Sequence, residues 1–579
     1  MPNMIQNAKD SISQILNDAY QKAAEKGELP AGAALSGTVE IPKDSANGDF
    51  AANHAMAGAK ALHMAPRKIA ETLIANADLA DTWFASVEVA GPGFINFRLA
   101  DRWYADVLRA VTGEGADYGR SDIGHGQKVM VEFVSANPTG PMHMGNARGG
   151  VLGDALASVL SRAGYQVWRE FYVNDAGNQI EKFANSIDAR YQQLLLGEEQ
   201  VAFPEDGYHG DDIKDLARLF YEANGDKYLT VPVTERHQAM AEFGLQRNIP
   251  KMQEDLRRYG IEYDQWFFES ELHESGYVAE SVQKLTDRGY TYEKDGALWL
   301  KTSQILTEQL LKSGKKQEEI DKLELKDDVL RRANGFYTYF AADIAYHRNK
   351  LEKRGFDKAI NVWGADHHGH VARLKGAMDA LGLDGEHRLD IVLMQLVKLT
   401  RNGEVVRMSK RTGKAISLTD LLDEIPVDAA RYFFNSRPES PVEFDLELAI
   451  RQDSENPVYY VQYAHARICT LLAALAAEGH TVPANADAAL LSTPEEKELI
   501  KQLAALPEEI RQAARDYDPS RINRYVTELA ARFHRFYTVC RIKGAESDVQ
   551  AARLLLADCV RRVIAVSLGI IGVTAPEKM

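Results

Sequence analysis

The sequence predicts an α/β protein in three parts: an N-terminal α+β module, a central domain built on a parallel sheet, and a C-terminal all-α bundle. Its 579 residues are too many for one hydrophobic core, so we expect about three or four domains. In the centre, short β-branched runs alternate with helical patterns, as a parallel sheet with crossover helices requires. From Asn456 onward, apolar residues recur at helical spacing, which predicts a bundle.

The N-terminal module is expected over residues 1–115. A helix from Ile5 to Lys26 precedes a second helical stretch that continues through Leu73. Between Ser86 and Leu99 the side chains alternate around a Gly-Pro-Gly turn, which indicates two paired strands. Residues 122–126 then form a linker.

The central domain is expected over residues 122–450, with a polar, mostly helical insertion at about 179–258. Its predicted strands include Val129–Ser135, Gln166–Val173, Ala359–Trp363 and Ile391–Leu399. The bundle is expected over 452–579, with helices at Val461–Ala477, Pro494–Asp516, Pro519–Val539 and Asp548–Leu568.

Composition favours a soluble globular protein, with 45% hydrophobic and 26% charged residues. No apolar run reaches membrane-spanning length, and the first residues lack the pattern of a secretory signal, so we expect a cytoplasmic protein without membrane contact. The three cysteines, Cys469, Cys540 and Cys559, lie in apolar helical patterns and predict buried side chains; they offer neither a disulfide framework nor zinc spacing.

The formal net charge of −16 argues, at face value, against a polyanionic partner. RNA contact depends on local patches, however, and the basic run from Arg407 to Lys414 is one. Because the net charge is negative and the basic patch is local, we expect an affinity for RNA that is moderate and sensitive to salt.

One segment predicts a phosphate site. From Val131 to Gly150 the pattern is a buried strand, a Pro/Gly turn, and a helix that begins near His143 and Gly145. A helix start offers unpaired N–H groups and the positive end of a dipole, and small residues let an anion approach the backbone. The alternative is that the turn serves packing alone.

Two further clusters carry charge or imidazole groups. The loop from Arg407 to Lys414 is cationic and contains glycine, and its alternative interpretation is a solvated basic loop. The histidines at 367, 368 and 370 follow a predicted strand, where adjacent side chains point to opposite sides. This favours a substrate-pocket or packing role for them over metal binding.

The strand–turn–helix segment and the basic loop resemble the HIGH and KMSKS signatures of class I aminoacyl-tRNA synthetases. At the first, His143-Met144-Gly145-Asn146 has Asn146 in place of the usual second histidine. At the second, residues 407–411 read Arg-Met-Ser-Lys-Arg, with Arg407 in place of the first lysine.

Further motifs narrow the resemblance to bacterial arginyl-tRNA synthetases, over essentially the whole chain. They are Val131 to Pro141, Tyr339 to Tyr346, Trp363 to Gly369, Asn456 to Arg467 and Leu568 to Met579. The resemblance implies a Rossmann-like catalytic domain, an N-terminal module that binds the tRNA elbow, and a C-terminal anticodon-binding domain. It also implies that L-arginine is activated with ATP and Mg²⁺ to arginyl-adenylate and passed to the 3′-terminal ribose of tRNA(Arg), by a monomer without zinc.

The resemblance assigns site residues position by position. For ATP they are His143, Gly145, Asn146, Met408, Ser409 and Lys410, of which His143, Gly145, Asn146 and Lys410 are the catalytic set. For arginine they are Glu132, Asn137, Glu269, Tyr339, Asp343 and His367. For tRNA they are Phe94, Asn96, Tyr460, Tyr463, Arg467, Tyr537 and Met579.

Elementary chemistry agrees with an arginine pocket, because carboxylates bind a planar guanidinium bidentately. Tyr339 and Asp343 have i,i+4 spacing, so one helix face could present a phenol and a carboxylate together, although a solvent-exposed pair is the commoner outcome. Glu269 could equally be a surface carboxylate at the end of a strand. Phe94 and the aromatic residues of the bundle could be core side chains.

Two rival functions remain open. One is a tRNA-independent ligase that adenylates a small acid, which would leave the N-terminal module and the bundle unexplained. The other is a non-catalytic RNA-binding protein derived from a synthetase, against which the retention of His143, Gly145 and Lys410 argues.

Overall fold

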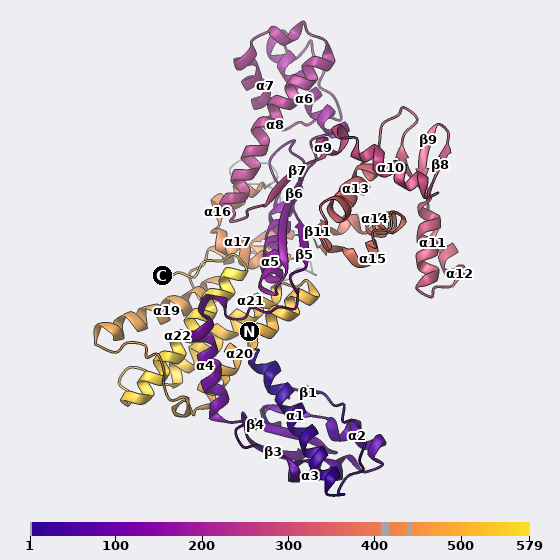
Figure 1. The fold of residues 1–579 in the computed structure, drawn as a ribbon. Coiled ribbons are helices and arrows are strands. Elements are labelled where there is room, and N and C mark those ends of the chain that lie inside the picture. The colour runs from indigo at the N-terminus through magenta and orange to yellow at the C-terminus, as the bar shows by residue number, and fades with distance from the viewer. Residues whose placement is uncertain (1–2, 396, 407–415, 437–441) are drawn as a thin grey trace.

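The computed structural model describes residues 3–395, 397–406, 416–436 and 442–579. Figure 1 shows the N-terminal module at the bottom, the central domain with its insertion above, and the helical bundle at the lower left. The predicted α/β fold class, with an N-terminal α+β module and a C-terminal all-α bundle, is confirmed.

The N-terminal module is an antiparallel sheet with strand order β1-β2-β4-β3, covered by helices. Its elements are α1 (Met4–Glu25), β1 (Val39–Glu40), β2 (Phe50–Ala52), α2 (His54–Leu62), α3 (Pro66–Asn76), β3 (Phe84–Ala90), β4 (Phe94–Leu99) and α4 (Asp101–Glu114). The predicted hairpin is confirmed: β3 pairs with β4, and the turn uses positive φ at Gly91 (51°) and Gly93 (139°). Helix α4 leads out of the module and packs against the bundle.

The central sheet is wholly parallel, with strand order β12-β11-β5-β6-β7. Its strands are β5 (Lys128–Glu132), β6 (Gln166–Val173), β7 (Gln265–Phe268), β11 (Lys358–Gly364) and β12 (Leu389–Met394). Since β5 and β6 are joined through α5 (Met144–Arg162), and the later strands β11 and β12 add on the other side of β5, the strand order reverses between β5 and β11. Ligands bind in such sheets at this switch point, beyond the carboxyl ends of the strands.

Each face of the central sheet is buried in a different core. Phe171 and Val173 of β6 point into the core shared with α5 and the bundle, whereas Tyr172 between them points into a second core. That second core includes side chains of α13 (Tyr339–Arg348) and α14 (His368–Ala380). Period-two alternation therefore aims Tyr172 at the α13 side of the sheet.

Two strand predictions were wrong in their bounds. The predicted strand Val129–Ser135 ends at Glu132, because Val134 and Ser135 take positive φ angles of 71° and 42°. The predicted strand Ile391–Leu399 is two strands in different sheets: β12 ends at Met394, and β13 (Val397–Arg401) pairs with β14 (Glu404–Val405) and β15 (Val442–Asp445). Both predicted strands are apolar and rich in β-branched residues, so their sequence pattern did not indicate where the strand ends.

The region of the predicted insertion holds three helices, α6 (Asn178–Leu196), α7 (Asp211–Asn224) and α8 (Val233–Arg258), which form a projection with its own small core. The chain returns through a mixed segment. Its elements are α9 (Glu269–Glu274), α10 (Tyr277–Asp287), β8 (Thr291–Lys294), β9 (Ala297–Leu300), α11 (Thr302–Lys312), α12 (Gln317–Ile320), β10 (Asp328–Arg331) and, after α14, α15 (Gly385–Arg388). A π-helical turn, Asn349–Lys353, continues α13.

The four predicted bundle helices are confirmed as α19 (Pro457–Ala477), α20 (Pro494–Asp516), α21 (Ser520–Val539) and α22 (Ser547–Ile570). They follow the connecting helices α16 (Leu418–Glu424), α17 (Val427–Asn435) and α18 (Leu446–Ile450). Cys540 and Cys559 are buried, as expected, while Cys469 is only half-buried. Within the part of the chain that the structure describes, no helix could cross a membrane.

Candidate active site

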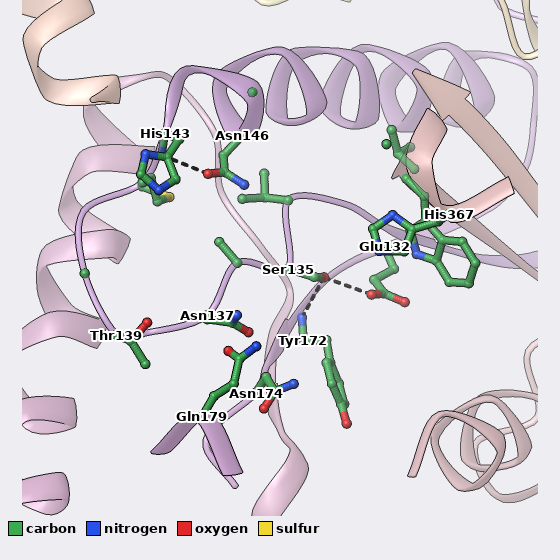
Figure 2. A pocket seen from close by; sticks show the side chains of 18 of the residues that line it. Glu132, Ser135, Asn137, Thr139, His143, Asn146, Tyr172, Asn174, Gln179 and His367 are labelled. Carbon is green, nitrogen blue, oxygen red and sulfur yellow. Dashed lines mark hydrogen bonds between the residues drawn. The ribbon is translucent and has the colours of Figure 1, made fainter. Parts of the chain in front are cut away.

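A cavity of about 860 Å³ lies at the carboxyl ends of the central strands, at the switch point. Its walls come from the exit of β5, the start of α5, the end of β6, helix α13 and the end of β11. Figure 2 shows side chains such as Glu132, His143 and Tyr172 around it. The insertion closes one side, because Tyr208, His209 and Asp212 also line the cavity. No sequence pattern predicted this contribution from the insertion.

A strained turn carries the chain from β5 into the cavity. Positive φ is rare for a β-branched residue such as Val134, and strain of this kind persists where neighbouring contacts enforce it. Here the Ser135 hydroxyl donates to Glu132 Oε1 at 2.9 Å and accepts from the backbone N–H of Tyr172 at 3.2 Å (Figure 2). The turn places Asn137 on the cavity wall.

His143 caps helix α5, whose positive end therefore faces the cavity. The backbone N–H of His143 donates to Asn146 Oδ1 at 2.9 Å. Asn146, in place of a histidine, thus uses its oxygen as a helix cap, which leaves its amide NH₂ as the group able to donate to a ligand. Gly145 lines the cavity, and no atom lies within 4 Å of the position a Cβ would take there, so any side chain would occupy ligand space.

The chain after the basic loop returns to the His143 turn. Ser417 forms a β-bridge with His143, and the Leu418 N–H donates to the Met142 carbonyl at 2.9 Å. The predicted residues Met408, Ser409 and Lys410 lie outside the described residues.

One wall of the cavity is acidic. Tyr172 lines it, and burial, followed by the negative charges of Glu269 and Asp343, raises the pKa of Tyr172 well above 10. Two buried oxygen atoms of cavity-lining residues, Asn174 Oδ1 and Gln179 Oε1, have no hydrogen-bond partner among the described residues, whereas the Tyr172 phenol is hydrogen-bonded to Glu269. Both amide oxygens can only accept, so the wall suits a cation with several N–H donors.

A hydrogen-bonded chain fixes the Asp343 carboxylate. His370 Nε2 lies 3.0 Å from Asp343 Oδ2, and Arg373 donates to His370 Nδ1 at 3.2 Å. Since a guanidinium can only donate, His370 Nδ1 must accept, and its proton sits on Nε2 and is donated to Asp343. Arg373 also pairs with Asp328 at 2.5 Å. Asp343 Oδ1 remains available to a ligand in the cavity.

A buried polar layer supports the cavity floor. The Lys350 ammonium, with a fully buried side chain, lies 2.5 Å from Glu132 Oε2 and 3.1 Å from Asn361 Oδ1. Asn361 donates to His347 Nε2 at 2.6 Å, and His347 Nδ1 donates to the Asp343 carbonyl at 2.8 Å. Burial lowers the pKa of Lys350, and burial together with the Lys350 charge lowers the pKa of His347 well below 6.5. His347 is therefore neutral.

The predicted ATP and arginine residues divide into three groups. Glu132, Asn137, His143, Gly145, Asn146, Asp343 and His367 line the one cavity. Glu269 is only 2% exposed and acts on the cavity through Tyr172, while Tyr339 is 41% exposed at the start of α13, its ring 3.5 Å from where a methyl group at Gly177 would lie. The sequence did not predict Asn174 and Gln179 as site residues. Both follow β6, the strand that pairs with β5 in the central sheet.

The predicted RNA-contacting residues of the bundle form one cluster. Arg467 lies 4.1 Å from the ring centroid of Tyr537 and 5.9 Å from that of Tyr463. His534, which the sequence did not single out, lies 4.8 Å from Tyr460 and 6.2 Å from Tyr463 between ring centroids.

The other predicted RNA contacts lie elsewhere. Met579 is 53% exposed in a tail that His465 holds through the Pro576 carbonyl at 2.8 Å. In the N-terminal module Phe94 is half-buried, but Asn96 is only 3% exposed within the sheet. Asn96 could therefore meet a base only if its surroundings moved.

Three family models match the chain in succession. They are described as the arginyl tRNA synthetase N-terminal domain (residues 6–99), the catalytic domain of class I (R) tRNA synthetases (109–442) and the DALR anticodon-binding domain (461–579). Among curated relatives, the arginine–tRNA ligase of Acetivibrio thermocellus is 52% identical and that of Caldanaerobacter subterraneus subsp. tengcongensis 54%, each match covering both chains completely.

Solved structures agree. A putative arginyl-tRNA synthetase from Campylobacter jejuni is 33% identical with a TM-score of 0.73, the match covering 83% of this chain and 100% of that one. The Thermus thermophilus arginyl-tRNA synthetase, at 21% identity, shares the fold with a TM-score of 0.72 over 99% of this chain and 100% of its own. By its catalytic-domain match and its full-length relatives, the chain belongs to the arginyl-tRNA synthetase family of class I aminoacyl-tRNA synthetases.

Proposed function

We propose that this chain activates L-arginine with ATP, releasing diphosphate, and transfers the arginyl group from the adenylate to the 3′-terminal ribose of tRNA(Arg). The observation that carries the proposal is one cavity in which the positive start of α5, at His143, lies beside an acidic wall centred on Asp343 and Tyr172. Such a cavity can hold a polyphosphate and a guanidinium side by side.

Arginine recognition is assigned to the acidic wall. The guanidinium would bind Asp343 Oδ1 and the unpaired oxygens of Asn174 and Gln179, with Glu269 supplying negative charge through Tyr172. Asn137, Tyr339 and His367 are proposed to contact the rest of the amino acid. The Glu132 carboxylate is compensated by Lys350, so its proposed contribution is to shape the floor.

Catalysis of adenylate formation is assigned to positioning and charge stabilisation, because the arginine carboxylate is itself the nucleophile. It attacks the α-phosphorus of ATP and diphosphate leaves. His143, the N–H groups of the α5 start and the Asn146 amide would hold the phosphates, Gly145 would leave room for the nucleoside, and Lys410, with Met408 and Ser409, would close over the leaving diphosphate. The Ser417 bridge to His143 supports this, since Ser417 closely follows the basic run in the sequence.

The proposed domain roles follow the same division as the sequence. Residues 1–115, through Phe94 and, after a local movement that exposes it, Asn96, would contact the tRNA elbow, and residues 452–579 would bind the anticodon. The Tyr460, Tyr463, Arg467 and Tyr537 cluster offers aromatic faces and a cation for unstacked bases, and Met579 lies on the exposed tail.

Mg²⁺ is proposed to enter bound to the ATP phosphates and to neutralise part of their charge. Among the described residues, no three His, Cys, Asp or Glu side chains are grouped to hold a metal ion. A zinc-free, monomeric protein that works in the cytoplasm remains part of the proposal.

The decisive experiment is aminoacylation of tRNA(Arg) with labelled arginine, in parallel with lysine and glutamate. Only arginine should be attached. Arginine-dependent ATP–diphosphate exchange, measured with and without ribonuclease, tests the tRNA-independent ligase, and absence of both activities would favour the non-catalytic RNA-binding alternative.

A further inference from the structure

A second cavity, of about 490 Å³, is lined by residues from all three parts of the chain, and none of them lines the cavity at the carboxyl ends of the central strands. Asn3 comes from the N-terminal module, Arg120 and Ser121 immediately precede the linker, and α20 of the bundle contributes Arg511 and Arg515. His125 and Asp122 of the linker also line it. Three arginines thus face one cavity of a protein whose net charge is −16.

Two of its polar atoms are buried without a partner among the described residues: the hydroxyl oxygen of Ser121 and Nε of Arg511. Such atoms are uncommon in proteins and call for an explanation, because a buried unpaired donor costs about 1–3 kcal/mol. Both groups can donate. A ligand that accepts hydrogen bonds on several oxygens would satisfy them together.

The basic groups are also held close to one another. Arg511 and Arg515 are four residues apart on one helix, an arrangement in which like charges repel. The pKa of Arg162 is lowered first by burial and then by the positive charge of Arg120. The Arg162 guanidinium lies beside the linker and donates to the Ala116 carbonyl at 2.9 Å. An anion in the cavity would relieve this repulsion.

Acidic groups compensate only part of this charge. Asp117 pairs with Arg120 at 2.7 Å, and Glu508 lies 3.5 Å from Arg511 while also accepting from Asn3 at 3.2 Å. Asp122 has an 84% exposed side chain beside His125. No ion pair of Arg515 is found within the described ranges, and its side chain is exposed.

We propose that this cavity is a binding site for a phosphate group, held by Arg511, Arg515 and Arg120 with the Ser121 hydroxyl, at the junction of the N-terminal module, the central domain and the bundle. Arginine suits phosphate oxygens because its guanidinium donates two parallel hydrogen bonds. The phosphate is either a backbone group of the RNA or a free phosphate. In both cases the ligand would tie the three parts of the chain together.

The test compares the full-length protein with an Arg511→Gln/Arg515→Gln double variant. Arg109→Gln/Arg524→Gln is the matched control, since it removes the same charge from exposed arginines of α4 and α21 outside the cavity. The first arm measures binding of labelled inorganic phosphate by equilibrium dialysis with the active site filled by a non-hydrolysable ATP analogue. The second arm measures the salt dependence of the Kd for tRNA(Arg). Circular dichroism and ATP–diphosphate exchange verify that each variant is folded.

For a free phosphate, we expect one phosphate per chain in the wild type and the control, and none in the Arg511/Arg515 variant. For an RNA phosphate, we expect the salt slope of log Kd to fall by about 1–2 in that variant alone. If phosphate binding and salt slope are both unchanged, or if the control variant changes as much, the proposal is wrong.

Discussion

The buried pair of Lys350 and Glu132 allows a quantitative prediction about the cavity floor. The Lys350→Met substitution keeps most of the side-chain volume but leaves the Glu132 carboxylate, in a residue 5% exposed, without its cation. Removing one partner of a buried ion pair costs about 3–5 kcal/mol. Asn361 also loses the donor at 3.1 Å from its oxygen, which would unsettle its bond to His347.

Hydrogen exchange followed by mass spectrometry measures this cost locally, which suits a protein of several domains. Since 1.4 kcal/mol corresponds to a factor of ten, exchange in β5 and α13 should become about 10²- to 10⁴-fold faster. Adding Glu132→Gln should recover more than half of the loss, because no unpaired charge then remains. Arginine KM should rise in the single variant and partly recover in the double variant.

The control is Lys358→Met, which breaks the pair with Asp390 at the other end of β11, where the lysine side chain is 32% exposed. A partly exposed pair of this kind contributes about 0–1 kcal/mol, so exchange should change less than tenfold. Equal effects of the two substitutions, or a double variant as unstable as Lys350→Met, would refute the account of the buried layer.

Four further outcomes are expected in assays that contain tRNA. Asp343→Asn should raise arginine KM on the order of 10²-fold with little change in ATP KM; unchanged arginine kinetics would remove this residue from the pocket. Arg373→Met should raise arginine KM less, at unchanged kcat, and Arg373→Lys should restore it; equal KM values in both variants would contradict a role in fixing His370. Lys410→Ala should lower kcat about 10²- to 10³-fold with substrate affinity retained; lost substrate affinity at normal kcat would contradict a role of Lys410 in stabilising the transition state. The folded-state pKa of His347 lies well below 6.5, so only the unfolded chain gains a proton at this residue as the pH falls through 6.5. The free energy of unfolding should therefore fall there by up to about 1.4 kcal/mol per pH unit. His347→Gln should flatten that slope, and an identical pH profile in the variant would disprove the assignment.

The sequence by itself determined the three-part division, the helices of the insertion and bundle, and most strands of the central sheet, because these depend on local periodicity and turn residues. It also determined the strand, turn and helix start around His143, the proposed phosphate site, since these elements are contiguous in the chain. The family motifs added the proposed arginine pocket as a set of positions. They could not say how those side chains are supported.

Only the tertiary structure decided which groups meet. Lys350 and Glu132 are 218 residues apart in sequence, and Arg373 acts on Asp343 through His370 across two helices. It also separated β12 from β13 and showed that Asn174 and several residues of the insertion, Gln179 and Tyr208 among them, enclose the cavity. Burial and charge compensation depend on what packs against a residue from elsewhere in the chain. No local pattern records that information, so the pocket's electrostatics emerge only when the chain has folded.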